Sequence, residues 1–350
     1  PGTAIVKARS SDGLAGESNP LKIETGIGRV LWADLHGHTG LTDGTGTPKD
    51  YFRYARDVAG LDIVALTDHD HWGMRPLAVH PELWEEIRRE TELFHRQDDF
   101  VTLLGYEWTS WIHGHRHVLY FSDQGLILSS IDRDYESPLQ LWDALRDANA
   151  LTFAHHSAGG PIATNWTIPP DPELEPVTEI VSVHGSSEAP DSPAVIYSPV
   201  AGNFVRDVLD RGYVFGFLGS GDGHDGHPGL AHLNSVSGGL AAILSEDLSR
   251  SGIKEAMQDR RVYATNGPRI LLEVNLAGHQ MGSVIESRVW DGLSPQERSL
   301  GIVVSGTDSL QRLDVIRSGQ VAVEFDCGGS PVCEADLLVL EVEPGEYLYV

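Results

Sequence analysis

The chain has 350 residues, more than a single hydrophobic core usually supports, so we expect one large domain with a smaller one attached. Its 51 acidic and 25 basic side chains give a formal net charge of −26, which repels phosphate backbones and disfavours nucleic acid as substrate or partner. Apolar residues make up an ordinary 41% of the chain, but no apolar run approaches the ~20 residues of a membrane span, and no signal-peptide pattern follows Pro1. We therefore expect a globular protein without membrane contact, whose compartment (cytoplasmic or exported) and oligomeric state stay open.

Residues 1–28 show little periodicity, and we expect an N-terminal linker or edge strand there. Between residues 29 and 266, apolar strand-like runs alternate with amphipathic helical stretches, a pattern typical of βα units around a mainly parallel sheet. The clearest unit is a strand at 30–35 followed by a helix that begins after Thr47 and ends at Gly60. Further strands are expected at 62–66, 101–104, 117–121, 151–154, 179–183 and 214–218, and further helices at 81–97, 138–149, 203–211 and 253–260. About seven strands alternating with helices predict a closed or distorted α/β barrel, whose functional residues follow the carboxyl ends of the strands.

The pattern changes in residues 267–350, where short strands are separated by Gly-rich turns, and this predicts a smaller, β-rich, sandwich-like C-terminal domain. Both cysteines, Cys327 and Cys333, lie in this part. They form a disulfide if the protein is exported, or remain two free thiols, and the sequence does not decide between these states. The expected strands are 270–276, 301–305, 313–318, 321–325 and 337–342.

Metal-binding residue types accompany the expected strands of the larger domain. His36 and His38 end the first strand, where side chains two positions apart lie on one side and can bind the same ion. Surface histidines explain an isolated pair of this kind equally well, but similar residues recur beside five further strands. Because a barrel gathers these positions at one mouth, the sequence predicts a metal centre, and imidazole with carboxylate but no thiolate suits zinc, manganese or iron. The recurring residues are Asp68-His69, Glu107, His117, His155-His156 and Asp222-Gly223-His224.

The chain resembles the PHP (polymerase and histidinol phosphatase) superfamily in two runs, DLHGHTGLTDG and TPKDYFRYARDVAGLDIVALTDHD. The motifs GYE, a lone histidine at His117, AHH and GDGH follow in the order of that family, so that the similarity spans about residues 30–225. Residues 30–350 are most similar to a large branch of the superfamily whose function is unknown. The resemblance implies a distorted seven-stranded β/α barrel that binds two or three divalent metal ions, which are zinc, manganese or iron.

The resemblance also implies a complete set of metal ligands. In the family's pattern one carboxylate bridges two ions, and that position is occupied here by Glu107. For the histidine of the fifth strand, His155 aligns best because it directly follows the strand, and His156 is the alternative. The first ion would be bound by His36, His38 and Asp222, the second by His117 and His155, and a third by Asp43, His69 and His224.

Other residues are candidates for contact with the substrate. His184 follows the strand at 179–183, and Arg116 lies in a polar loop with His113 and His115, although plain surface exposure explains these positions equally well. His156 or His184 could stabilise a departing alkoxide. Two carboxylates, Asp34 and Asp68, could orient ligand histidines or could cap strand ends. Four tryptophans near the barrel mouth could line a pocket but are more often packing residues: Trp72, Trp108, Trp111 and Trp166.

Hydrolysis of a small phosphate ester is the leading functional hypothesis. Two ions can lower the pKa of a bridging water, so that the resulting hydroxide attacks a phosphomonoester or diester whose charge the ions neutralise. The same hydroxide could instead attack an amide, lactone or carbamate, as in an amidohydrolase or lactonase. A third hypothesis is a secreted, non-catalytic binding protein in which the metals only stabilise the fold.

Overall fold

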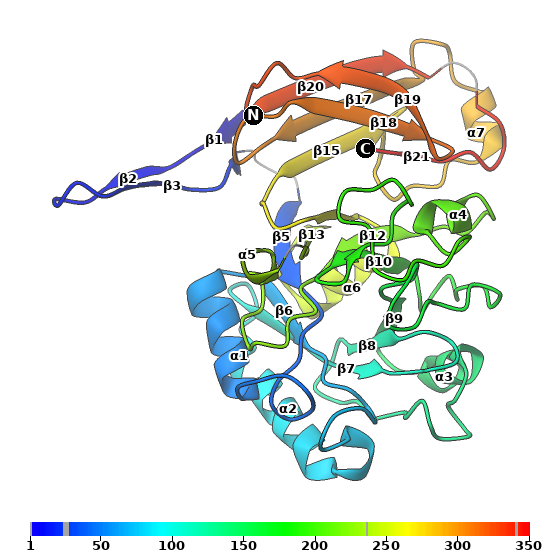
Figure 1. The fold of residues 1–350 in the computed structure, drawn as a ribbon. Coiled ribbons are helices and arrows are strands. Elements are labelled where there is room, and N and C mark those ends of the chain that lie inside the picture. Colours follow the sequence, from blue (N-terminus) through cyan, green and yellow to red (C-terminus); the bar gives the residue numbers. More distant parts are fainter. Residues whose placement is uncertain (1, 24–27, 236, 340–341) are drawn as a thin grey trace. The chain divides into compact units, whose positions relative to one another are not determined.

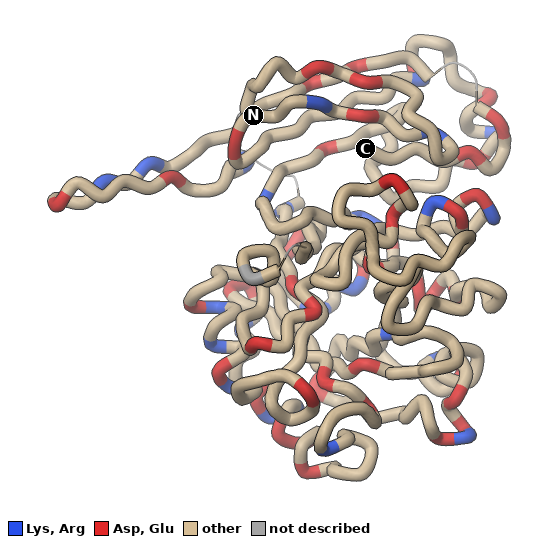
Figure 2. The backbone as a smooth tube through the Cα atoms, in the orientation of Figure 1, with Lys and Arg blue, Asp and Glu red and all other residues tan. Residues whose placement is uncertain are grey.

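The computed structural model describes residues 2–23, 28–235, 237–339 and 342–350. The chain divides into two compact units, one of residues 29–267 and one that combines the described residues of 1–28 with those of 268–350. Acidic side chains are spread along the backbone of both units, and basic side chains are fewer (Figure 2). None of the described helices is long and apolar enough to span a bilayer.

The larger unit is a mixed α/β structure built on a ten-stranded sheet (Figure 1). The strand order is β11-β10-β9-β8-β7-β6-β5-β13-β14, and β12 pairs with β10 away from this path. Pairing is parallel for β5-β6-β7 and for β9-β10-β12, whereas β8 is antiparallel to both of its neighbours. The strands are β5 (Arg29–Asp34), β6 (Ile63–Leu66), β7 (Val101–Trp108), β8 (Arg116–Tyr120), β9 (Ala150–Ala154), β10 (Val177–Ser182), β11 (Gly185–Ser186), β12 (Gly216–Gly219), β13 (Leu240–Ser245) and β14 (Val262–Thr265).

The sheet curls so that the segments following β5 and β12 meet. The backbone N–H of Asp222 donates to the carbonyl of His36 at 2.8 Å, and the N–H of His38 donates to the carbonyl of Gly223 at 2.9 Å. The close approach of β12 to β13 also requires a glycine, because a Cβ on Gly219 of β12 would lie 2.7 Å from the carbonyl oxygen of Leu240 in β13. The ends of strands from both halves of the sheet therefore surround one interior.

Helices cover the sheet, and their ends follow the expected local chemistry. The helix α1 (Pro48–Tyr54) continues as the π-helical turn η1 (Ala55–Ala59); Thr47 caps its start, and Gly60 ends it with a left-handed φ of 61°. In α3 (Pro138–Leu145), Ser137 and Gln140 form a capping box. The remaining helices are η2 (Leu77–Val79), α2 (Pro81–Phe94), α4 (Val205–Leu209), α5 (Ala231–Asn234) and α6 (Arg250–Gln258). The main core contains apolar side chains of β5 to β10, β12 to β14 and α6.

Each of the seven strands expected in this part is present, but the count of seven is not confirmed, because β11, β13 and β14 join the same sheet. The expectation of a mainly parallel sheet is also wrong. The seven residues between β7 and β8 are too few for a crossover connection, so these strands form an antiparallel hairpin.

The smaller unit contains two packed β-sheets with a common core that includes Leu300, Ile302, Leu313 and Val315. Its strands β1 (Gly2–Ala4) and β4 (Leu21–Ile23) pair, as do β2 (Lys7–Arg9) and β3 (Ala15–Glu17), so the described part of 1–28 consists of paired strands. Cys327 and Cys333 form a disulfide. Residues 1 and 24–27, and 340–341 of the strand expected at 337–342, lie outside the described residues. One sheet is β16 (His279–Gln280), β15 (Leu271–Leu276), β17 (Ser299–Ser305) and β20 (Val332–Leu338), the other is β19 (Gln320–Asp326), β18 (Arg312–Arg317) and β21 (Leu348–Tyr349), and one short helix is α7 (Ser287–Asp291).

Candidate metal centre

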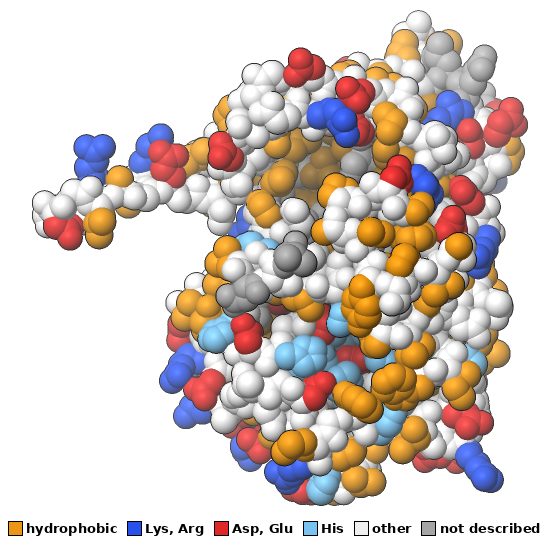
Figure 3. Space-filling model, viewed as in Figure 1, with side chains coloured by type: hydrophobic (Ala, Val, Ile, Leu, Met, Phe, Trp, Pro, Cys, Tyr) orange, Lys and Arg blue, Asp and Glu red, His pale blue; other side chains and the backbone are white. Residues whose placement is uncertain are grey.

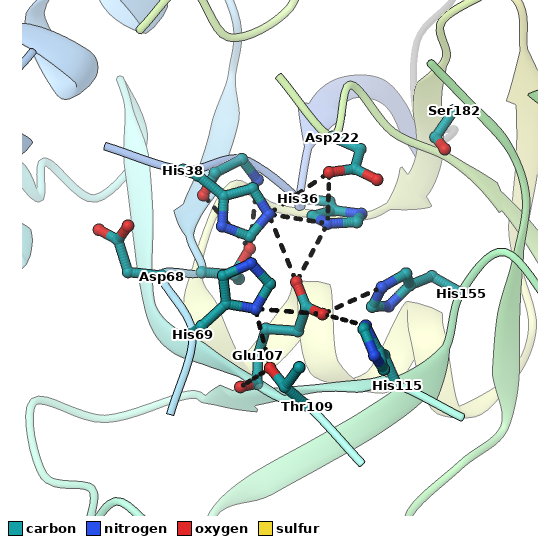
Figure 4. Close-up of polar contacts among 12 residues, drawn as sticks. His36, His38, Asp68, His69, Glu107, Thr109, His115, His155, Ser182 and Asp222 are labelled. Atoms are coloured by element: carbon teal, nitrogen blue, oxygen red, sulfur yellow. Dashed lines mark hydrogen bonds and ion pairs between the residues drawn. The ribbon is translucent and has the colours of Figure 1, made fainter. Parts of the chain in front are cut away.

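Histidine and carboxylate side chains converge at the end of the sheet where the segments after β5 and β12 meet (Figure 4). Four groups, each with three or four side chains, have their potential ligand atoms within 4.8 Å of one another, a spacing at which they could hold metal ions. All nine residues expected from the sequence as ligands are members of these groups. The groups are His36, Glu107, His117 and His155; His38, Asp43, His69 and His224; His36, His38 and Asp222; and His115, His155 and His156.

Glu107 lies at the centre of this cluster. It is buried in β7, opposite His117 of β8 in the strand register. Each of its two carboxylate oxygens faces a different set of imidazoles, as expected for a group that bridges two cation positions. Oε2 lies 3.5 Å from His36 Nε2 and 3.3 Å from His38 Nε2, and Oε1 lies 2.6 Å from His115 Nδ1, 3.3 Å from His155 Nε2 and 3.4 Å from His69 Nδ1.

The other two carboxylates extend the cluster to further histidines. Asp222 Oδ1 lies 3.1 Å from His36 Nε2, while its Oδ2 lies 2.8 Å from His184 Nε2. Asp43 Oδ2 lies 3.3 Å from His69 Nε2 and 3.4 Å from His224 Nε2. Because the side chains of Asp43 and His224 are 25% and 39% exposed, the cluster opens to solvent on this side.

Glu179 is a functional candidate that the sequence did not single out. This buried residue of β10 lies with its Oε2 3.0 Å from Nδ1 of His36, on the ring nitrogen that faces away from Glu107. Such a contact fixes the tautomer and the orientation of an imidazole ligand. The available signal was strand alternation, since Glu179 shares the inward side of β10 with the core residue Val177.

Asp34 and Asp68 accept hydrogen bonds from loop residues and not from histidine rings. Asp34 accepts hydrogen bonds from the backbone N–H groups of Gly221 at 2.8 Å and Gly229 at 2.7 Å. Asp68 accepts from the N–H of Thr39 at 3.0 Å and from its hydroxyl at 2.6 Å. Of the two roles left open by the sequence, the capping role describes these contacts, which fix the loops that carry Asp222 and His38.

The expectation that Arg116 faces a substrate is corrected by its position. Its Nε donates to Glu175 Oε2 at 2.9 Å, and both side chains are fully buried. Its guanidinium also lies over the ring of Trp142, 5.6 Å from the centroid. Adjacent residues of a strand point to opposite faces, so when His117 points into the cluster Arg116 points away from it.

Three further histidines complete the cluster. His156 is buried, has a positive φ of 37°, and its ring lies 4.9 Å from that of His115 and 5.4 Å from that of His184. His184 reaches the cluster through Asp222. His115 was expected only as a loop residue, yet it is buried within the cluster. Its spacing of two residues from His117 was the signal that both could point inward.

The unpartnered nitrogen atoms of the cluster test whether it suits metal ions. Buried polar atoms without a hydrogen-bond partner typically cost ~1–3 kcal/mol each, so native proteins rarely accumulate them. Coordination of cations by these nitrogens would remove that cost, and neutral imidazoles with carboxylates are the ligands that zinc, manganese and iron accept. Within the described residues, the unpartnered nitrogens are Nδ1 of His38, Nε2 of His115, both nitrogens of His117, Nδ1 of His155 and Nδ1 of His156.

Electrostatics favour the same conclusion. Burial lowers the pKa of His38 to about 4, with His69 acting in the same direction, and burial lowers the pKa of His155 to about 3. Burial raises the pKa of Glu107, but its histidine neighbours, His69 first, outweigh burial and hold that pKa well below its usual range. For Asp222 the neighbouring His36 outweighs burial in the same way. At neutral pH His38 and His155 are thus neutral while Glu107 and Asp222 are ionised, the states in which these groups bind divalent cations. Burial lowers the pKa values of His36 and His69, but the neighbouring carboxylates outweigh it and raise them, so a bound cation would take the place of the protons on these two rings.

An open groove adjoins the cluster at Asp43. It has a volume of about 610 Å³ and is lined by Asp43, His71, Trp72, Gly73, Met74 and Trp111. Of the four tryptophans considered from the sequence, Trp72 and Trp111 lie in this groove, whereas Trp108 and Trp166 are buried packing residues. Figure 3 shows histidines gathered in a hollow of this face, with hydrophobic side chains beside them.

The fold and the site together define an α/β protein with a candidate polynuclear metal centre. The chain belongs to DUF3604, a family of proteins of unknown function, whose model matches residues 64–195 and 229–284, more than half of the chain. This match confirms the prediction from the sequence that the chain belongs to a branch of unknown function.

Similar curated proteins are found in Chlamydia and are uncharacterized. One of Chlamydia pneumoniae is 28% identical over 85% of this chain and 48% of its own length, and one of Chlamydia trachomatis is 25% identical over 86% and 49%. The chain thus spans about half the length of the curated relatives it matches.

Two solved structures also show similarity. A two-domain protein of Bacteroides vulgatus, described as containing a predicted PHP-like metal-dependent phosphoesterase, has a TM-score of 0.49 and 17% identity, with 89% of this chain and 86% of that chain covered. A lesion-specific endonuclease Q of Pyrococcus furiosus has a TM-score of 0.42 and 13% identity, with 66% and 56% covered.

Proposed function

We propose that this chain is a metal-dependent hydrolase, and that it acts as a phosphoesterase on a small phosphomonoester or diester. The observation that carries the proposal is the position of Glu107, whose two oxygens lie within 3.5 Å of five histidines from four separate segments. A buried carboxylate with such surroundings is suited to bridging two cations and has no evident structural purpose without them.

The proposed ligand assignment follows the groups of converging side chains. Residues of each group offer three or four donors, which leaves coordination positions for water or substrate. When bound, two or three divalent ions of zinc, manganese or iron would acidify water and neutralise phosphoryl oxygens. The proposed ligands are His36, His38 and Asp222 for one ion, His117 and His155 for the second with Glu107 between the two, and Asp43, His69 and His224 for a third.

The chain's own residues would orient these ligands and supply a proton. Glu179 holds Nδ1 of His36, so Nε2 is directed at the cluster. Burial lowers the pKa of His184, but the Asp222 carboxylate outweighs it and raises that pKa above its usual value. His184 can therefore hold a proton on Nε2 at neutral pH and give it to a departing alkoxide. His156, whose ring lies 5.4 Å from that of His184, is the second candidate for this role.

A small substrate is proposed because the protein offers little attraction for a polyanion. The formal charge is −26, and the one arginine expected near the site, Arg116, is engaged by Glu175. We also propose that residues 29–266 form the hydrolase domain, a distorted barrel of PHP type, and that residues 267–350 form a separate β-rich domain with residues 1–28 as an accessory segment.

The test is an activity panel on protein loaded with zinc, manganese or iron. Phosphomonoesters and short diesters are compared with amides, lactones and carbamates, using Glu107→Gln as the inactive variant and Glu90→Gln of α2 as a control outside the cluster. We expect turnover of phosphate esters that Glu107→Gln reduces at least ~100-fold and Glu90→Gln leaves unchanged. Turnover of acyl substrates alone, or no turnover by fully loaded protein, would overturn the phosphoesterase proposal.

A further inference from the structure

The groove beside the candidate metal centre has an unusual composition. Three of its six lining residues are large apolar side chains that remain exposed, Met74 at 90%, Trp72 at 47% and Trp111 at 44%. The lining contains no Lys or Arg. Exposed apolar side chains are common singly, but a contiguous group in a concavity is typical of binding sites.

Two loops carry the tryptophans, and one buried carboxylate fixes both. We call residues 71–74 and 109–112 the tryptophan loops. Asp70 Oδ1 accepts a hydrogen bond from the N–H of Thr109 at 3.0 Å and lies 3.0 Å from Nδ1 of His71. Because Asp70 is fully buried, the two loops are held in a defined relation rather than left to solvent.

The first tryptophan loop is also seated directly against the metal centre. The N–H of Met74 donates to the carbonyl of Thr42 at 3.2 Å, and Thr42 precedes the candidate ligand Asp43. Gly73, with a φ of +93°, permits this approach, since a Cβ there would lie 2.7 Å from the carbonyl carbon of Thr42. A molecule bound in the groove would therefore lie next to Asp43.

The second tryptophan loop reaches the cluster at His115. The rings of Trp72 and Trp111 lie 5.1 Å apart at an interplanar angle of 62°, and the ring of Trp111 lies 5.8 Å from that of His115. The tryptophan pair thus forms a continuous surface from Asp43 to His115. It offers a face and an edge to a planar ligand, an arrangement that suits an aromatic ring.

We infer that Trp72 and Trp111 form a subsite for the leaving group of the substrate, and that this group is an uncharged aromatic ring. The inference rests on the proposed function for the position of the scissile bond. Charge complementarity favours a neutral group, because the lining offers no cation to a second phosphate or carboxylate, and Asp43 would repel one. The substrate class is accordingly a phosphate ester of an aromatic alcohol.

Two phosphate esters with alcohol leaving groups of similar acidity, benzyl phosphate and ethyl phosphate, test the substrate class. We expect kcat/KM for benzyl phosphate to exceed that for ethyl phosphate about tenfold, since stacking on an aromatic side chain is worth ~1–3 kcal/mol. In the double variant Trp72→Ala with Trp111→Ala the ratio should fall to about one, whereas Leu126→Ala, a change at an exposed apolar residue outside the groove, should keep it. A wild-type ratio near one would overturn the inference.

Binding of a neutral probe separates this inference from the proposed function. The fluorine NMR signal of 4-fluorobenzyl alcohol should broaden with the wild-type protein and not with the double variant, with or without metal. Such binding combined with no turnover of any phosphate ester would support the aromatic subsite and refute the phosphoesterase. Turnover of both esters at equal rates, with no broadening of the probe signal, would support the phosphoesterase and refute the aromatic subsite.

Discussion

Nδ1 of His36 lies 3.0 Å from Oε2 of Glu179, and both side chains are buried at the centre of the candidate metal site. This contact links a strand on one side of the sheet, β10, to the loop that follows β5. It leaves Nε2 of His36 directed at Glu107 and Asp222.

Glu179→Gln is therefore expected to weaken metal binding without removing a ligand. Loss of the charged partner makes His36 less basic and less well oriented, and changes of this kind typically lower affinity ~10–100-fold. Metal titration by calorimetry measures the effect, with Glu90→Gln of α2 as a matched control. Equal affinities for Glu179→Gln and the wild type would contradict this role.

Two glycines that flank Asp222 should respond differently to alanine. A Cβ on Gly221 would lie 2.5 Å from Oδ2 of Asp34, whereas the nearest atom to a Cβ on Gly223 is 3.7 Å away, an ordinary contact. Gly221→Ala should lower the free energy of unfolding by ~1–3 kcal/mol, and Gly223→Ala should change it little. Chemical denaturation of both variants provides the comparison, and equal stabilities would show that the approach of Asp34 is not tight.

The metal-free protein should lose stability as the pH falls from about 6.5 toward 4. Burial lowers the pKa of His38 to about 4 and that of His155 to about 3, so below their unfolded value of 6.5 the unfolded chain binds protons that the folded protein does not. Groups with raised pKa values, such as His69 at about 10, contribute with the opposite sign, but only near pH 6.5, because about one pH unit below that value they are protonated in both states.

Thermal or urea unfolding of the protein, freed of metal by a chelator, measures how the free energy of unfolding changes between pH 7 and 4.5. One group with a lowered pKa can add up to about 1.4 kcal/mol per pH unit to this slope. His155→Asn should flatten it. A slope unchanged by this variant would mean that His155 titrates normally in the folded protein.

The disulfide between Cys327 and Cys333 should stabilise the smaller unit only modestly. The six-residue separation closes a short loop, for which the loss of chain entropy corresponds to ~2 kcal/mol. Thiol titration of the denatured, unreduced protein should find no free thiol. Reduction should lower the unfolding temperature of this unit and leave the bound metal content unchanged, whereas loss of metal on reduction would link the cysteines to the centre.

Local sequence signals predicted much of the fold. The cap at Thr47, the stop at Gly60 and the alternation of apolar runs located strands β5 to β10 and β12 together with the principal helices. Strands β13 and β14 were not expected. β13 pairs with β5 through contacts between residues about 200 positions apart, as between Ala33 and Ala241, and β14 joins the sheet by pairing with β13. Such pairing is decided by tertiary packing that a single sequence does not display.

The candidate site could be predicted as a set of residue types but not as a geometry. All nine expected ligands lie in the cluster, yet Glu179 and His115 were passed over and Arg116 was placed on the wrong side. Each of these three positions depends on the phase of a strand, since a shift of one residue exchanges the two faces. The sequence gives strand positions to within a few residues, which is too coarse to fix that phase.

Anomalous diffraction from crystals of metal-loaded protein, at the absorption edge of the metal found by elemental analysis, tests the central claim most directly. We predict two or three peaks, with one on each side of Glu107, in contact with His36, His38 and Asp222 on one side and with His117 and His155 on the other. Absence of any peak near Glu107 in fully loaded protein, or peaks confined to other parts of the chain, would contradict the account.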